Sequence, residues 1–210
     1  MPEPVVRDAA TVILVRDPAG TPQVLVGTRQ RNAVFLPDHV VFPGGAVDAS
    51  DADVALAGGL GALCRARLDG ATPPHAFAAA GVRELFEETG LTYGQRGGFA
   101  PPPGWEGFAT RGVQPSAAGL SFVFRAITPP GRTRRFDARF FLADAAGISG
   151  DPDDFSGASG ELSDLAWVGL DHLWGRKIAP VTQAALQAVA ARLPDLGPPE
   201  HLVVRGAPEP

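Results

Sequence analysis

Hydrophobic stretches separated by turn-forming residues predict a series of strands along the chain. Residues 9–15 read AATVILV, and the turn-rich DPAGTP separates them from a second hydrophobic stretch at 23–28, which predicts an opening hairpin. A short strand is predicted at 40–42, where VVF runs into the double glycine that we expect to end it. Further strands are predicted at 120–127, 136–142, 165–168 and 201–204.

Two segments have the pattern of helices. Residues 73–89 begin with two prolines, which a first helical turn tolerates, and are followed by Gly90, the residue type most common just after a helix. Residues 179–193 carry hydrophobic side chains at intervals of three and four, typical of an amphipathic helix packed on a sheet. Strands combined with two such helices are compatible with an α/β fold.

Two further segments are rich in glycine and proline. Within 46–74, hydrophobic residues recur at roughly helical intervals, so a small helix is expected there despite interrupting glycines. Residues 94–117 are polar and are expected to form a long loop or lid. Trp105 in that loop could stack on a base or anchor the loop by packing, and packing is the favoured interpretation.

Composition limits the class of protein. The 210 residues suit one domain spanning 1–210, and 45% hydrophobic with 20% charged residues is ordinary globular usage. A net charge of −5 provides no basic surface for nucleic acid or anionic membrane, so neither is expected as a partner. Cys64 is the only cysteine, which excludes an intramolecular disulfide and fits a reducing cytoplasm. Without a signal-like start or a long apolar run, we expect a soluble cytoplasmic protein.

Three glutamates are crowded near the end of the predicted 73–89 helix. Glu84, Glu87 and Glu88 are spaced so that a helix of about 3.6 residues per turn places them on one face. Like charges at this spacing repel, and compensation comes either from Arg83 and solvent or from a hard divalent cation that prefers oxygen ligands. A solvated acidic face is the alternative to a metal site.

Gly45, Asp51 and the segment RELFEETGL at 83–91 together resemble the Nudix hydrolase box. The preceding VFPGG at 41–45 is similar to the strand and loop that lead into that box. The chain departs from the family pattern in having an insertion at about 52–74, and in having Asp rather than Glu at position 51, which leaves the role of Asp51 open. Loop closure costs only about 0.6 kcal/mol per doubling of length, so such an insertion is tolerable.

Interrupted boxes with FLP before VFPGG and an RRFDARFFLA-like strand downstream resemble the branch that includes peroxisomal coenzyme A diphosphatases. A second coenzyme A pattern of the family is met only in part, at Leu25 and Arg29. The resemblance implies hydrolysis of a nucleoside diphosphate linked to another group, with coenzyme A or acyl-CoA as first candidate. ADP-ribose, a dinucleotide, or a non-catalytic nucleotide-sensing module are the alternatives. A small nucleotide-type molecule is therefore the expected partner, and a homodimer is left open.

The resemblance also implies the fold and the site. The expected fold is a mixed α/β sheet with the 73–89 helix on one side and the 179–193 helix on the other. Splitting a P–O–P link requires neutralised phosphate oxygens and an activated water, which Mg²⁺ or Mn²⁺ held by carboxylates supplies. The expected site comprises metal ligands Glu84, Glu87, Glu88 and the Gly45 carbonyl, Arg83 orienting Glu87, and a general base at Glu161 or Asp164 before Trp167.

Arginines are candidates for binding the substrate phosphates, because their planar fork matches phosphate oxygens. Arg29 is preferred, and Arg135 is the second candidate. Solvation at the surface is the alternative explanation for both. The four histidines show no paired metal spacing and are expected to be structural or exposed.

Overall fold

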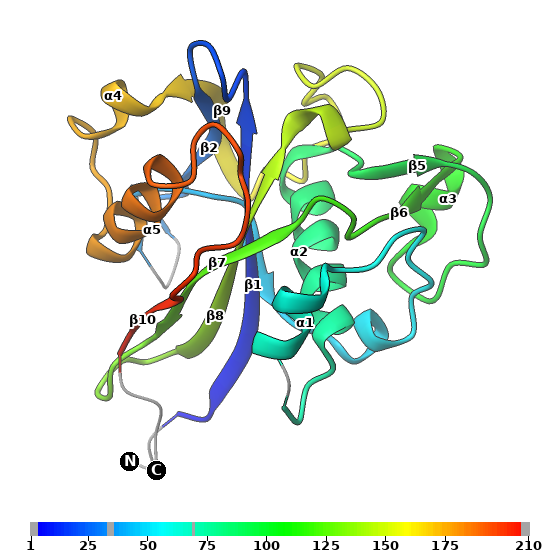
Figure 1. Ribbon diagram of the computed structural model, residues 1–210, viewed down its shortest axis with the longest axis horizontal. Helices are drawn as coiled ribbons and strands as arrows, with labels where there is room; N and C mark the ends of the chain where they lie inside the picture. Colours follow the sequence, from blue (N-terminus) through cyan, green and yellow to red (C-terminus); the bar gives the residue numbers. More distant parts are fainter. Residues whose placement is uncertain (1–3, 33–35, 69, 207–210) are drawn as a thin grey trace.

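The computed structural model describes residues 4–32, 36–68 and 70–206, and in this part of the chain a mixed β-sheet lies between helical layers (Figure 1). Phe35 of the FLP motif falls outside the described residues. The strands are β1 (Val6–Arg16), β2 (Gln23–Arg29), β3 (Val40–Val41), β4 (Gly44–Ala46), β5 (Gly94–Arg96), β6 (Val113–Pro115), β7 (Ser121–Ile127), β8 (Arg135–Asp144), β9 (Leu162–Gly169) and β10 (Val203–Arg205). The predicted α/β class is confirmed.

Strand β1 is the centre of the sheet. The sheet order is β10-β7-β8-β1-β2-β3, with β4 beside β1 and β9 beside β2. Strands β1 and β8 run parallel from the pair Val6 and Arg135 to the pair Val15 and Asp144. Residues 12–15 are fully buried because helices cover both faces, which explains their continuous hydrophobic run. The predicted opening hairpin is confirmed by the antiparallel pairing of β1 with β2.

The strand predicted at 40–42 ends before the double glycine, since β3 stops at Val41. Gly44 and Gly45 form a separate strand, β4, which pairs with β1 opposite Thr11 and Ala10. A Cβ atom at position 44 would lie 2.6 Å from the carbonyl oxygen of Ala10. The missing side chains therefore let this short strand lie against β1 instead of ending the sheet.

The two predicted helices are confirmed on opposite faces. Helix α2 (Pro74–Thr89) ends at Gly90, whose φ of 80° is the left-handed conformation of a helix stop. Helix α5 (Pro180–Ala190) covers the other face, and the two helices pack into separate hydrophobic clusters (Figure 1). Helix α2 lies close to the sheet, since a Cβ at Gly81 would approach Val12 to 2.9 Å. A short helix α4 (Leu170–Leu173) and a 3-10 turn η2 (Ala145–Gly147) complete this part.

The glycine- and proline-rich segment 46–74 is folded into the core. It contains a 3-10 turn η1 (Ala49–Ala52) and the expected small helix, α1 (Ala62–Arg67). Its buried hydrophobic residues belong to the same hydrophobic cluster as those of α2: Val54, Leu60, Cys64 and Leu68. This segment thus extends the layer that covers the sheet on the α2 side.

Residues 94–117 are not the loop or lid that composition predicts. Strands β5 and β6 form an antiparallel pair, with helix α3 (Glu106–Thr110) between them. Trp105 is fully buried, its ring 5.3 Å from Phe108, which in turn lies 4.9 Å from Phe86 on α2. Packing is therefore the confirmed role of Trp105. Buried aromatic residues outweigh the many glycines and prolines in deciding how this segment folds.

No helix among the described residues is long and apolar enough to cross a membrane.

Candidate active site

The glutamates of α2 meet the glycine strand β4. The backbone N–H of Gly44 donates a hydrogen bond to Oε2 of Glu88 at 2.9 Å. The carboxylate of Glu84 lies directly against Gly45, where any Cβ atom would overlap it. These contacts bring together two parts of the predicted motif that lie about forty residues apart in the sequence. Glycine at position 45 is needed because the carboxylate occupies the space that a side chain would take.

Arg83 joins the two halves of the motif through a buried ion pair. Its Nε and Nη2 donate to Oδ1 and Oδ2 of Asp51 at 2.9 and 3.0 Å, and Asp51 is fully buried. Its Nη1 donates to Glu84 at 2.9 Å and to Glu87 at 3.2 Å, so the contact expected between Arg83 and Glu87 is present. The structure places Asp51 as the partner that holds Arg83, although sequence left its role open. A bidentate pair of this kind fixes the guanidinium plane.

Burial disfavours the ionised form of Glu84 and of Glu88. It raises the pKa of Glu84 to about 7, with Arg83 opposing the shift and the charges of Glu87 and Glu161 adding to it. It raises the pKa of Glu88 to about 8, with the Gly44 N–H opposing and the charges of Glu84 and Glu161 adding. Two carboxylates held close together and away from water are the arrangement that a cation would stabilise.

The donor set fits a hard divalent cation, although it is not a preformed metal centre. Among the described residues, no three His, Cys, Asp or Glu side chains converge as metal ligands. Glu84 and Glu87 point to Arg83, while Glu88 accepts from Gly44. The available donors are all oxygens, as Mg²⁺ and Mn²⁺ prefer, and the missing side chain of Gly45 lets the Glu84 carboxylate lie against the backbone there.

The loop that carries Glu161 is attached to the end of α2. The N–H of Ser159 donates to the carbonyl of Glu87 at 2.9 Å, and a Cβ at Gly90 would lie 2.8 Å from the backbone of Gly157. Arg111 strengthens this junction, because its Nη1 donates to the carbonyl of Gly90 at 2.5 Å. The box glycine at position 90 thus ends the helix and also allows the loop to approach.

The charge of Glu161, one of the two candidate bases, acts on the glutamates. The Glu161 side chain is exposed, and its charge adds to the raised pKa of both Glu84 and Glu88. The carboxylate of Asp164, the other candidate, accepts from Ser163 Oγ at 3.1 Å. The role of Glu161 as a general base stays a prediction.

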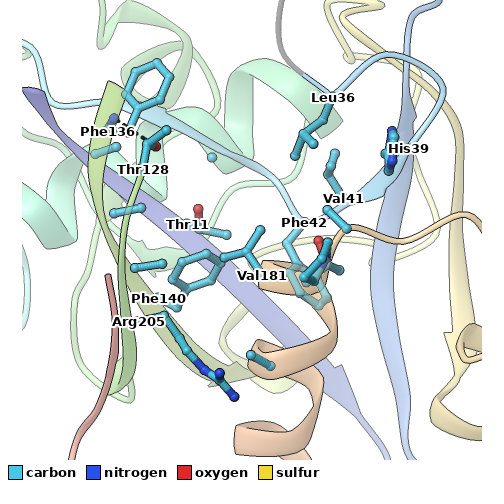
Figure 2. Close-up of a pocket in the computed structure, with 18 of the residues that line it drawn as sticks. Thr11, Leu36, His39, Val41, Phe42, Thr128, Phe136, Phe140, Val181 and Arg205 are labelled. Atoms are coloured by element: carbon cyan, nitrogen blue, oxygen red, sulfur yellow. Dashed lines mark hydrogen bonds between the residues drawn. The ribbon is translucent and has the colours of Figure 1, made fainter. Parts of the chain in front are cut away.

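A cavity of about 1040 Å³ lies on the α5 side of the sheet and reaches the glycine strand (Figure 2). Gly44, Gly45 and Arg29 line one end of it, whereas none of the three glutamates does. Arg29 ends β2, and its positive charge opposes the raised pKa of Glu88. Arg29 is therefore placed to act between the glutamates and the cavity.

Arg135 does not fit the predicted substrate-binding role. It is 3% exposed and is not part of the cavity wall. Its Nε donates to the carbonyl of Thr128 at 3.1 Å, within the β7–β8 hairpin. Burial at the base of this hairpin explains why an arginine next to two exposed arginines has a structural position instead.

Sequence reasoning missed most of the cavity wall. Its floor includes Thr11, Phe136 and Phe140, and Val181 of α5 faces them. The alternation of 136, 138 and 140 along β8 is a signal that these side chains share one face of the sheet. Helix α5 supplies the facing wall through packing between distant segments, for which no local pattern exists.

Comparisons with known proteins point to one family. No family model matches the chain. A Caenorhabditis elegans protein assigned by name to the nudix hydrolases is 28% identical over 182 residues, covering 77% of this chain and 51% of that protein. The chain thus spans about half the length of this curated relative.

Solved structures share the fold. The crystal structure of a NUDIX hydrolase from Alicyclobacillus acidocaldarius has a TM-score of 0.69 and 28% identity, covering 90% of this chain and 92% of that one. A NUDIX hydrolase from Nitrosomonas europaea has a TM-score of 0.52 at 11% identity, covering 89% and 90% of the two chains. The chain therefore has the fold of the Nudix hydrolases.

Proposed function

We propose that this protein is a Mg²⁺- or Mn²⁺-dependent hydrolase that splits the diphosphate linking a nucleoside to another group. The observation that carries the proposal is the gathering of Glu84 and Glu88 against the glycine strand, beside a large cavity. The similarity to a NUDIX hydrolase over nine-tenths of both chains supports hydrolytic chemistry at this place.

Each residue of the proposed site has a distinct task. Glu84, Glu87, Glu88 and the carbonyl of Gly45 would hold the cation, which when bound neutralises phosphate oxygens and lowers the pKa of water. Arg83, held by Asp51, orients the carboxylates of Glu84 and Glu87.

Two residues outside the box complete the proposal. The carboxylate of Glu161 accepts the proton of the attacking water, and its attachment beside the end of α2 supports this role. Arg29 binds the diphosphate at the end of the cavity that touches Gly44 and Gly45.

The first candidate substrates are coenzyme A and its acyl derivatives. The interrupted box and the FLP and RRFDARFFLA segments resemble the coenzyme A diphosphatase branch. A cavity of about 1040 Å³ with apolar walls also suits a ligand larger than a mononucleotide. ADP-ribose and dinucleotides contain the same diphosphate link and belong in the same assay.

The test is a hydrolysis panel with Mg²⁺ containing coenzyme A, an acyl-CoA, ADP-ribose and a dinucleoside polyphosphate, with products identified by mass spectrometry. We expect at least one compound to release a nucleoside monophosphate, which for coenzyme A carries one additional phosphate. Glu87→Gln should reduce turnover at least a hundredfold, while Glu106→Gln on α3 serves as an exposed control. Binding of a nucleotide without product release would instead identify a non-catalytic module and refute the proposal.

A further inference from the structure

Strand β9 contains a bulge close to its first residue. The pairing of β2 with β9 shifts by one residue between Val26 and Thr28, so that Gly27 lies opposite two residues, Asp164 and Leu165. Two residues that face one define a β-bulge, which bends a strand and redirects the side chains beyond it. This bulge lies immediately after the loop that carries the proposed base.

Asp164 holds the bulge in a conformation that few residue types adopt. Its φ is 52°, in the left-handed region that glycine, asparagine and aspartate tolerate and β-branched residues avoid. Its side chain is exposed, and among the described residues its carboxylate has one hydrogen bond, accepted from Ser163 Oγ at 3.1 Å. The backbone of Asp164 is thus fixed by the bulge, while its carboxylate contacts the residue next to it in the sequence.

The bulge decides which face of the sheet the start of β9 occupies. Side chains alternate along a strand, so a regular β9 would place Leu162 on the face of Ala166, which packs on the α5 side. Instead, a Cβ atom at Gly27 would lie 2.8 Å from Leu162 and 3.0 Å from Leu165. The extra residue therefore turns Leu162 to the face of Trp167, which packs in the cluster of α2.

Contacts on both sides fix the chain around Glu161. The backbone N–H of Ser159 donates to the carbonyl of Glu87 at 2.9 Å. The side-chain N–H of Gln30 donates to the carbonyl of Gly160 at 2.5 Å. On the other side, β9 begins at the next residue and pairs with the end of β2. The position of Glu161 beside the end of α2 thus depends on the direction in which β9 begins.

We infer that Asp164 is a positioning residue for Glu161, and that it acts through its left-handed backbone at the bulge and not through its carboxylate. This inference rests on the proposed function, because it takes Glu161 as the base that acts at the α2 glutamates. A regular strand would turn Leu162 to the α5 face and carry the Glu161 carboxylate away from α2. The second candidate base of the sequence is thereby given a different task.

The test compares substitutions of Asp164 that keep or lose the left-handed conformation, using Mg²⁺ and the compound of the hydrolysis panel that is turned over. Asp164→Gly and Asp164→Asn remove the carboxylate but tolerate a positive φ, so both should keep kcat within about twofold of the wild type. Asp164→Val disfavours a positive φ and should lower kcat about tenfold with unchanged KM, because a misplaced base slows the chemical step.

Asp17→Val is the matched control. Asp17 is also an exposed aspartate with a left-handed backbone, at φ of 51°, but it lies in the turn between β1 and β2. That turn is at the opposite end of β2 from the pairing with Leu162. Asp17→Val should therefore lower the Tm as Asp164→Val does, while keeping the kcat of the wild type.

A double variant separates positioning from a general loss of structure. In the Glu161→Gln background, Asp164→Val should cause no further loss of kcat, since the residue that it positions is already disabled. Equal losses in both backgrounds overturn the inference, as does full kcat in Asp164→Val or in Glu161→Gln. A loss in Asp164→Gly and Asp164→Asn as large as that in Glu161→Gln would identify the Asp164 carboxylate as the base and also overturn it. These four results leave the hydrolase proposal intact.

Failure of the proposed function has a different signature, which is that the wild type turns over no compound. Mg²⁺ binding is then compared by calorimetry, because a carboxylate held near the α2 glutamates strengthens the binding of a cation. Glu161→Gln and Asp164→Val should weaken Mg²⁺ binding by similar factors, and Asp164→Gly should not. Any other order of affinities overturns the inference. Asp164→Ala, a smaller change that also disfavours a positive φ, repeats either test should Asp164→Val unfold.

Discussion

Replacement of Asp51 by Asn tests whether the buried ion pair with Arg83 joins the two halves of the box. The two side chains form hydrogen bonds of 2.9 and 3.0 Å, and their side chains are 0% and 6% exposed. Asparagine keeps the shape but removes the charge and turns one acceptor into a donor that faces a guanidinium N–H. Breaking a buried pair from one side costs about 3–5 kcal/mol.

The lower end of that range is expected, because Arg83 keeps Glu84, Glu87 and the carbonyl of Ala46 as acceptors. A loss of about 3 kcal/mol corresponds to a fall in Tm of about 6–12 °C for a chain of this size. Urea denaturation of the metal-free protein measures the change in the free energy of unfolding. Weaker Mg²⁺ binding by calorimetry should accompany it, since the carboxylates of Glu84 and Glu87 are then held more firmly by Arg83.

Asp48→Asn is the matched control. Asp48 also faces Arg83, but at 3.8 Å and with its side chain 58% exposed. An exposed pair contributes no more than about 1 kcal/mol, so this variant should unfold almost as the wild type does. Equal losses of unfolding free energy in the two variants would refute the conclusion that the buried ion pair of Asp51 with Arg83 joins the two halves of the box.

Three further predictions concern the same site. Gly45→Ala should lower both Mg²⁺ affinity and turnover at least tenfold, because the new methyl group displaces Glu84, whereas Gly59→Ala, with open space around it, should change neither value. Addition of Mg²⁺ should raise the Tm of the wild type but not that of Glu84→Gln, and EDTA should reverse the rise. Arg111→Lys should loosen the loop that packs against Gly90, because it removes the guanidinium that donates to the Gly90 carbonyl. We expect faster hydrogen exchange in residues 151–161 and a lower kcat with unchanged KM. Unchanged exchange would contradict this role.

Local sequence decided the elements that carry the site. Two prolines and Gly90 set the limits of α2, and the spacing of Glu84, Glu87 and Glu88 placed them together on that helix. The strands other than β4 and the β5–β6 pair follow from hydrophobic runs and turn residues, because both signals act within a few positions. Composition wrongly predicts a loop or lid at 94–117, because Trp105 and Phe108 are buried in a cluster that includes α2, and this contact has no local signal.

Tertiary structure alone decided how the site is assembled. Arg83 meets Asp51 across 32 positions, and Glu88 meets Gly44 across 44. The folded segment 52–74 between them is compatible with both contacts. The arginine-lined cavity draws its wall from strands and loops throughout the chain and from α5. Periodicity and capping indicate where an element ends and which of its faces is buried. The partner that covers this face is set by packing between distant segments, which only the assembled sheet and helices determine.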